Sequence, residues 1–355
     1  MAAAINLFLI FTIFFCTCNA AKKPTPLPTF PAILVFGDSV MDSGNNNYIL
    51  TWIKANYHPY GQDYAGGIPT GRFSNGKLIP DMLASILGIK ETVPPFLDPR
   101  LSNDDLITGV NFASAGSGFD DSTSIFSQAN PVSKQIELFR NYIERLKGIV
   151  GEEKALKIIH SALVILSAGT NDWFFNFYDI PARRLHFNVS GYQDFLLDKI
   201  HSVAKELYDL GCRSMVVSGL GPTGCLPVQM SRSLQNLSQR HCLKDQNRDS
   251  QAYNQKLVKL LSQMQATLPG SRIVYNDFYR PVIDMITYPK KYGFSETKKG
   301  CCGSGLLQVS FLCDPWTPTC EDPSKFLFWD MIHPTLIAYQ YLVRYMVKDV
   351  LPKFF

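Results

Sequence analysis

Short apolar runs recur along the chain and predict β-strands. They are rich in β-branched residues and bounded by Gly, Asn, Asp or Ser, and a run that is apolar throughout is typical of a parallel strand covered on both faces. The four clearest runs are Ala32–Phe36, Ala162–Leu166, Ser214–Val217 and Arg272–Tyr275. Ile107–Phe112 is a weaker fifth candidate.

Longer segments with helical spacing of apolar residues lie between these runs. We predict helices over 132–146, 195–210 and 252–268, the second followed by Gly211, which suits a left-handed C-cap. Strands that alternate with helices in this way predict a parallel sheet with helices on both faces. We therefore expect an α/β fold of three layers, α/β/α, around a central, mostly parallel five-stranded sheet. Ligands of such sheets bind outside the carboxyl ends of the strands.

The N-terminus differs in composition from the rest of the chain. Ile5–Cys16 is an uncharged apolar run, followed by small and polar residues up to Ala21. The run is shorter than the ~20 residues needed to span a bilayer, so a secretory signal peptide over residues 1–21 is favoured over a retained anchor. We find no later membrane-spanning stretch. The sequence thus predicts a secreted, extracellular protein.

The remainder, residues 22–355, is predicted to form a single domain, since it contains no internal repeat, low-complexity tract or linker. Its apolar content is ordinary for a globular protein, at 46% hydrophobic and 18% charged residues for the whole chain. The formal net charge is +4 without a long Lys/Arg run, which argues against a nucleic-acid partner. No pattern indicates an oligomeric state.

Export changes the interpretation of the cysteines. Two of the nine, Cys16 and Cys18, lie in the predicted signal, which leaves seven. Zinc binding would be the alternative in a cytosolic protein, but disulfides are favoured in an oxidising compartment. Cys212 directly precedes an apolar run and is predicted to be a buried free thiol. The other six are expected to pair, with the connectivity open; they are Cys225, Cys242, Cys301, Cys302, Cys313 and Cys320.

Two tripeptides match the acceptor pattern for N-glycosylation. They begin at Asn188 and Asn236, in the sequences NVS and NLS. Both are consistent with secretion, and both are predicted glycosylation sites.

Several candidate catalytic residues lie directly after the predicted strands in the sequence. Ser39 ends the sequence FGDS directly after the first strand, where a tight turn could present its hydroxyl to the crevice. Alone this tripeptide is weak, because most Gly-Asp-Ser sequences are ordinary turns. Three further segments add weight: the small-residue loop NFASAGSG (111–118), the sequence GTND (169–172), and DMIHP (330–334), in which a carboxylate precedes a histidine by three residues.

Together these four segments resemble the four sequence blocks of the GDSL, or SGNH, hydrolases. The longer matches FGDSVMDSGNNN (36–47), GVNFASAGSG (109–118) and FWDMIHPT (328–335) resemble the secreted plant branch in particular. The blocks occur in order across essentially the whole predicted mature chain. The resemblance implies the flavodoxin-like SGNH hydrolase fold and serine ester hydrolase activity.

The resemblance also implies roles for individual residues. Ser39 would be the nucleophile, His333 its general base, and Asp330 the carboxylate that orients the imidazole. The oxyanion donors would be the backbone N–H groups of Ser39 and Gly116 and the side-chain amide of Asn171.

Two neighbours of these residues are given structural roles. Pro334 suits the first position of a helix, which would place His333 at the N-cap. Asp38 is expected to shape the turn below Ser39 by bonding nearby backbone N–H groups.

One further motif has a different explanation. The segment GLGPTG (219–224) matches the dinucleotide fingerprint G-x-G-x-x-G after a strand. Pro222 and Pro227 interrupt the helix that should bind a pyrophosphate, and Cys225 is expected in a disulfide. A structural or pocket-wall loop is therefore favoured, and no cofactor is predicted. The acidic residues show no metal-site spacing, so no metal is predicted either.

Three functions fit these observations. The first is hydrolysis of carboxylic esters, such as acylglycerols, acetylated cell-wall sugars or cutin-like esters, through an acyl-enzyme on Ser39. The second is acyl transfer, in which an alcohol replaces water. The third is a secreted lipid- or glycan-binding protein without turnover. Its usual signature is a missing nucleophile, base or oxyanion donor, and none is missing from this sequence, so the third function is the least favoured. Residues 48–70 and 176–190 are expected to line the substrate pocket.

Overall fold

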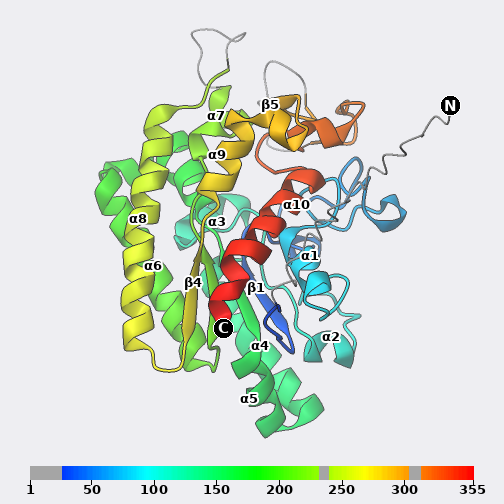
Figure 1. Ribbon diagram of the computed structural model, residues 1–355, viewed down its shortest axis with the longest axis vertical. Coiled ribbons are helices and arrows are strands. Elements are labelled where there is room, and N and C mark those ends of the chain that lie inside the picture. Colours follow the sequence, from blue (N-terminus) through cyan, green and yellow to red (C-terminus); the bar gives the residue numbers. More distant parts are fainter. Residues whose placement is uncertain (1–25, 232–239, 304–312) are drawn as a thin grey trace, which may run out of the picture.

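The computed structural model describes residues 26–231, 240–303 and 313–355 (Figure 1). The predicted signal peptide and the second predicted glycosylation site, Asn236, lie outside these ranges. The first site, Asn188, lies inside them: it is exposed and caps the N-terminus of a helix, its side chain accepting the backbone N–H of Gly191.

A parallel four-stranded sheet forms the centre of the fold, in the order β1-β2-β3-β4. The strands are β1 (Ile33–Gly37), β2 (Leu163–Ser167), β3 (Ser214–Ser218) and β4 (Arg272–Asn276). All four clear apolar runs thus form strands, each within a residue of its predicted bounds. Because the strands are parallel, their carboxyl ends meet at one edge.

The fifth predicted strand is wrong. Ile107 ends α2 (Asn103–Ile107), whose N-terminus is fixed by a capping box between Ser102 and Asp105. The chain then runs beside β1 but forms only an isolated parallel bridge, between Val35 and Asn111. Gly109 explains the irregularity: it has φ +94°, and a Cβ there would lie 2.0 Å from the carbonyl oxygen of Ile33. The close approach of the two backbones excludes a regular strand.

Helices cover both faces of the sheet, which confirms the predicted three layers. The longer ones are α4 (Val132–Val150), α5 (Glu152–Ser161), α6 (Val189–Asp209) and α8 (Lys244–Thr267) on one face, and α1 (Ile79–Ile86), α9 (Tyr279–Thr287) and α10 (Leu336–Tyr345) on the other. The short helices α3 (Asp121–Ser127) and α7 (Pro227–Met230) lie in loops. The predicted helices over 132–146, 195–210 and 252–268 correspond to α4, α6 and α8, of which α6 and α8 begin earlier than predicted.

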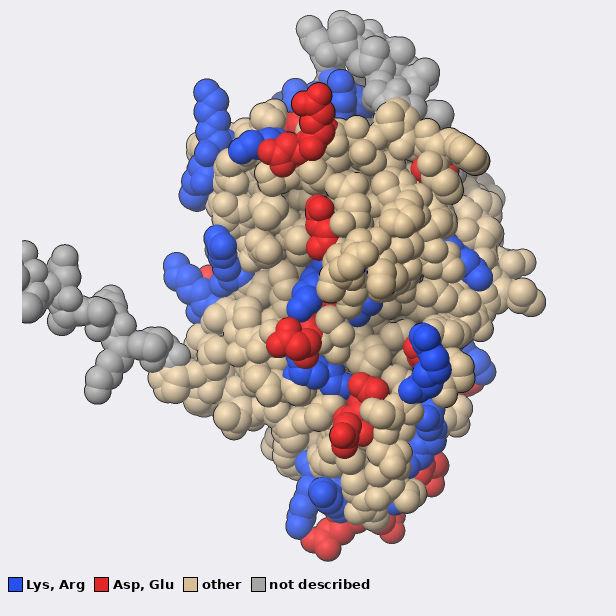
Figure 2. All heavy atoms as spheres, turned by 90° about the vertical axis from the view of Figure 1, so that its right-hand side faces the viewer, with Lys and Arg blue, Asp and Glu red and all other residues tan. Residues whose placement is uncertain are grey.

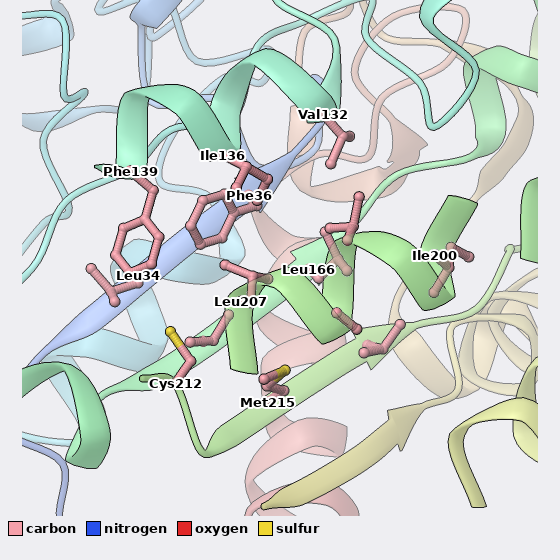
Figure 3. Packing of buried hydrophobic residues seen from close by; sticks show 14 of the residues in the cluster. Leu34, Phe36, Val132, Ile136, Phe139, Leu166, Ile200, Leu207, Cys212 and Met215 are labelled. Carbon is pink, nitrogen blue, oxygen red and sulfur yellow. The ribbon is translucent and has the colours of Figure 1, made fainter. Parts of the chain in front are cut away.

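Alternate residues of each strand supply the two cores. Figure 3 shows the larger core, where Ile136 and Phe139 of α4 face Leu34 and Phe36 of β1. The rings of Phe36 and Phe139 meet edge-on, with centroids 5.5 Å apart. Burying a side chain of this size contributes about 1.5–3 kcal/mol, so these contacts fix the position of β1 and of the loop that follows it.

A small second sheet lies apart from the first. It pairs β5 (Glu296–Gly300) with β6 (Phe326–Phe328) in parallel, and the sequence patterns gave no sign of it. Disulfides cross-link its surroundings, joining Cys301 to Cys320 and Cys302 to Cys313.

The expectations for the cysteines are confirmed. The third disulfide joins Cys225 to Cys242, and Cys212 is buried and unpaired, as predicted. Among the residues that the structure describes, no helix combines the length and apolar character needed to cross a membrane. On the face drawn in Figure 2, basic and acidic side chains are interspersed, and those of the described residues form no continuous basic patch.

Candidate active site

Ser39 lies in a tight turn at the carboxyl end of β1. Gly37 makes the turn possible: a Cβ at this position would lie 2.0 Å from the carbonyl oxygen of Ser167 in β2. The side-chain amide of Gln135 bonds both backbone groups of Gly37, at 2.8 and 2.9 Å. Asp38 accepts the backbone N–H of Val40 at 3.2 Å, which agrees with the structural role expected of it. The turn is therefore held from both sides of its serine.

The loop that carries Gly116 is held by buried side chains from the segment after Ser39. Asn45 donates to the carbonyl oxygens of Asn111 and Ala113, both at 2.8 Å. Asn46 donates to the carbonyl oxygen of Ala115 at 2.9 Å. These asparagines belong to the FGDSVMDSGNNN match, but sequence reasoning assigned them no role.

Asp42 completes this attachment. Its carboxylate accepts the backbone N–H of Ala115 at 3.0 Å, directly before Gly116. Burial raises the pKa of Asp42 to about 6, against the opposing effect of the backbone N–H groups that it accepts. The residues just beyond the turn of Ser39 therefore fix the loop of Gly116, which lies beside that turn.

Asn171 follows β2, directly before a π-helical segment, Asp172–Asp179. It is 5% exposed, and its side-chain nitrogen donates to the carbonyl oxygen of Ser117 at 2.9 Å. This bond turns the amide toward the loop of Gly116. Within the described part of the chain, the backbone N–H groups of Ser39 and Gly116 donate to no protein acceptor. Ser39, Gly116 and Asn171 all line one small cavity.

Asp330 and His333 follow β6 and reach Ser39 from the second sheet. Nε2 of His333 lies 2.7 Å from Oγ of Ser39, and Nδ1 lies 2.7 Å from Oδ2 of Asp330. All three residues are buried. Burial raises the pKa of Asp330, but the charge of His333 and hydrogen bonds from His333 and Ile332 outweigh it, so the pKa lies below its ordinary value. Asp330 is therefore ionised beside the imidazole.

The predicted N-cap position of His333 is wrong. Helix α10 begins at Leu336, and Thr335 is its N-cap, accepting the backbone N–H of Ala338. Pro334 instead forms an isolated antiparallel bridge with Phe328, and the carbonyl oxygen of His333 accepts the N–H of Trp329 at 2.7 Å. The hydroxyl of Thr335 is the better capping group, and two residues of extended chain separate the histidine from the helix.

Tyr60 is a residue of the site that sequence reasoning missed. Its hydroxyl donates to Oδ2 of Asp330 at 2.8 Å, the same oxygen that faces His333. Burial, followed by the charge of Asp330, raises the pKa of Tyr60 well above its ordinary value, so the tyrosine is a neutral donor. The two residues are separated by 270 positions in the sequence, so no local pattern could have predicted this contact.

Two cavities meet at Ser39, and both are also lined by Asn171 and Ile332. The larger encloses ≈ 820 Å³ including its open mouth, and the smaller ≈ 330 Å³. The smaller is lined by Ser39, Trp52, Ile53, Gly116, Asn171, Phe175, Ile332 and His333. The expectation for residues 48–70 is thus met by Trp52 and Ile53, whereas residues 176–190 line neither cavity.

The segment that resembles a dinucleotide fingerprint lines the larger cavity. Gly219, Gly221, Pro222 and Thr223 all belong to its wall. A short 3-10 turn follows, and helix α7 begins only at Pro227 and spans four residues. The segment is the pocket-wall loop that the sequence favoured. In the described ranges, no group of three or more His, Cys, Asp and Glu side chains is arranged to hold a metal ion.

Comparison with known proteins gives a consistent result. A family model described as "GDSL-like Lipase/Acylhydrolase" matches residues 33–346. A GDSL esterase/lipase of Arabidopsis thaliana is 54% identical over 96% of this chain and 97% of its own length. Another from the same plant is 50% identical over 99% of each chain.

A solved structure, that of a catalytic mutant of an acetylxylan esterase from Geobacillus stearothermophilus, matches at 15% identity. It covers 90% of this chain and 94% of that one, with a TM-score of 0.39, a value too low to carry an argument.

Proposed function

This chain belongs to the GDSL-like lipase/acylhydrolase family and is a carboxylic ester hydrolase, and from that premise we propose that it cleaves esters through an acyl-enzyme on Ser39. One observation carries the proposal: a continuous series of short contacts from Oγ of Ser39 through the ring of His333 to the carboxylate of Asp330, 2.7 Å at each end. A serine hydroxyl is a weak nucleophile until a base within hydrogen-bond reach removes its proton.

The first half of the reaction forms the acyl-enzyme. Nε2 of His333 takes the proton of Ser39 as Oγ attacks the carbonyl carbon of the ester, and Asp330 stabilises the imidazolium at Nδ1. His333 then gives that proton to the alkoxy oxygen, and the alcohol leaves. The depressed pKa of Asp330 supports this role, because an ionised carboxylate is required.

Negative charge develops on the carbonyl oxygen during the attack. The backbone N–H groups of Ser39 and Gly116 and the amide of Asn171 are the proposed donors to it. They need no reorganisation, since the buried contacts of Asp42, Asn45 and Asn46 already hold the loop. Such preorganised donors are the largest single contribution in many enzymes of this kind.

The second half returns the free enzyme. A water molecule gives one proton to His333 and attacks the acyl carbon, which releases the carboxylic acid and restores the hydroxyl of Ser39. The same three N–H donors face the oxyanion of this step. Hydrolysis thus uses each group twice, with His333 acting in turn as base and acid.

We also propose that the protein is secreted, with residues 1–21 removed as a signal peptide and with glycosylation at Asn188 and Asn236. Three disulfides support export, because such bonds persist in oxidising compartments. Expression in plant cells, with N-terminal sequencing of protein from the medium, tests this. The expected mature N-terminus lies near residue 22; retention in the cytosol with an intact N-terminus would contradict it.

The catalytic proposal is tested with a serine pair. Ser39→Ala removes the nucleophile, and we expect kcat for p-nitrophenyl esters to fall on the order of 10⁴-fold or more. Ser43→Ala is the matched control: its hydroxyl is also buried but has no hydrogen-bond partner among the described residues. Equal activity of the two variants, both folded, would exclude Ser39 as the nucleophile.

A further inference from the structure

The two cavities that meet at Ser39 differ in size and lining, and this difference has a consequence for the substrate. The larger is walled mostly by apolar side chains from separate segments of the chain, including Ile79 of α1, Leu226, Val282 of α9 and Leu342 of α10. The smaller is the one lined by His333 and Gly116. An ester bound at Ser39 has two arms, and each cavity can take one of them.

If the reaction follows the proposed function, the position of His333 determines which cavity holds the acyl arm of the ester and which holds the alcohol arm. The alkoxy oxygen must lie next to Nε2 of His333 to receive its proton, so the alcohol arm extends into the cavity that His333 lines. The carbonyl oxygen faces Gly116 and Asn171. The acyl arm therefore takes the remaining direction from Ser39, into the larger cavity.

We propose that the larger cavity is the acyl pocket and that the enzyme acts on esters of extended apolar acids rather than on acetates. The lining of the cavity is mostly apolar, as is typical of small-molecule sites. The acidic group in its wall, Asp38, accepts the N–H of Val40 and is buried. Burial raises the pKa of this carboxyl to about 7, which lessens its charge near neutral pH.

The alcohol side has a different character. Trp52 lines the smaller cavity and is itself 44% exposed, so the wall of this cavity continues to the protein surface. The ring of Trp52 meets that of Phe126 edge-on, and Leu50 and Ile125 nearby in the sequence are exposed apolar residues. An alcohol arm can thus project outward, and its size is not restricted by the ≈ 330 Å³ of the cavity.

Gly221 provides a clean way to block the acyl pocket. It lines the larger cavity, and a Cβ built on it meets no atom within 4 Å. Its φ lies outside the left-handed range, so a side chain can be introduced without backbone strain. Gly221→Leu should fill part of the pocket, and Val282→Phe on α9 provides a second, independent block. Gly148→Leu is the matched control, because Gly148 is exposed on α4 and equally open.

The experiment compares kcat/KM for p-nitrophenyl acetate, butyrate and octanoate, which differ only in the acyl arm. Each buried CH₂ is worth up to about fourfold, so wild type should prefer octanoate to acetate. We expect Gly221→Leu and Val282→Phe to lower the octanoate-to-acetate ratio at least about tenfold and Gly148→Leu to leave it unchanged. A wild-type preference for acetate would overturn the proposed substrate class.

Trp52→Ala separates the two cavities. It should change the ratio of 1-naphthyl to phenyl acetate, which differ only in the alcohol arm, and leave the octanoate-to-acetate ratio unchanged. If Trp52→Ala lowers the octanoate ratio and both blocking variants leave it within twofold, the assignment of the arms is reversed. Activity that survives Ser39→Ala would instead contradict the proposed acyl-enzyme, which the acyl-chain ratios do not test.

Discussion

The candidate site is built from two halves that are held in different ways. Ser39 and Asn171 follow the carboxyl ends of two neighbouring strands of the main sheet, β1 and β2, with Gly116 in a loop bonded beside them. Asp330 and His333 follow β6, which is a strand of the small second sheet. The first half depends on the register of a buried sheet, and the second on a segment cross-linked by two disulfides.

This difference indicates which substitutions should lower activity without unfolding the protein. Contacts of the first half are shared with the main core, so disturbing them disturbs folding as well. The second half is also packed into the fold, since Leu327 and Phe328 of β6 belong to the same core cluster as Ile33 and Val35 of β1. At the site itself it meets Ser39 and Tyr60 through single side-chain hydrogen bonds, one between His333 and Ser39 and one from Tyr60 to Asp330. Replacing these polar side chains by ones of similar size should therefore alter catalysis more than stability.

The largest effect is expected from the base. His333→Gln keeps a side chain of similar size but removes the group that accepts the proton of Ser39, and kcat should fall about 10⁴-fold or more. The melting temperature should change little. His201→Gln, at an exposed position of α6, is the matched control and should keep full activity. A comparable loss in both variants would argue against a specific role of His333.

The next effect belongs to the first half. Asn171→Ala removes one proposed oxyanion donor, and the expected loss in kcat is on the order of 10²–10³. It also removes the bond to the carbonyl oxygen of Ser117, so thermal unfolding should be measured alongside kinetics. A variant that is stable and fully active would show that Asn171 is not a donor to the oxyanion.

A disulfide pair tests the attachment of the second half. Cys301 and Cys302 bond the backbone of Phe328 and Trp329, directly before Asp330. Replacing Cys301 and Cys320 by serine should lower kcat about tenfold at a temperature where the variant is folded. The same change at Cys225 and Cys242, which close a loop of similar length, should affect kcat less. The reverse order would contradict the division into two halves.

A smaller effect is expected at Tyr60. Tyr60→Phe removes one donor to Asp330, so the carboxylate becomes more basic and stabilises the imidazolium more strongly. We expect the acid limb of the kcat/KM profile to move to higher pH, so kcat/KM measured on that limb should fall by about three- to tenfold, because less of His333 is in the form that accepts a proton. Tyr57→Phe, three residues earlier, is the control and should leave the profile in place. An unchanged profile in Tyr60→Phe would reduce the residue to a packing role.

The pH dependence of stability should give the smallest signal. Burial raises the pKa of Asp38 and Asp172 to about 7 and that of Asp42 to about 6. A carboxyl with a raised pKa binds its proton more tightly in the folded state, so stability falls as pH rises from the unfolded value, near 4, to the folded one. The melting temperature should therefore be higher at pH 5 than at pH 8. Asp38→Asn should flatten this slope, and an unaltered slope would exclude Asp38 as a contributor.

The parts of the fold that follow from local patterns were predictable. Four apolar runs became strands because a strand covered on both faces must be apolar throughout, and the residues after two of them, Ser39 and Asn171, are at the site for the same reason. Ile107–Phe112 was misjudged because the need for Gly109 arises only from the backbone of β1, which lies far away in the sequence.

Contacts between distant segments could not be derived in this way. The bond from Tyr60 to Asp330 and those from Asn45 to the loop of Gly116 join polar residues that periodicity treats as surface or turn. The second sheet was missed because β6 spans only three residues and β5 is largely polar. His333 lies beside Asp330 and Ser39, but its local conformation depends on pairing with Trp329, which no local pattern predicts.

The most direct test of the central claim is peptide mapping of the enzyme after rapid acid quenching during turnover of a p-nitrophenyl ester. An acyl group on the tryptic peptide that contains Ser39, and its absence in His333→Gln, is the result we predict. An acyl group on another residue, or turnover with no covalent adduct under conditions that trap acyl-serine, would contradict the mechanism.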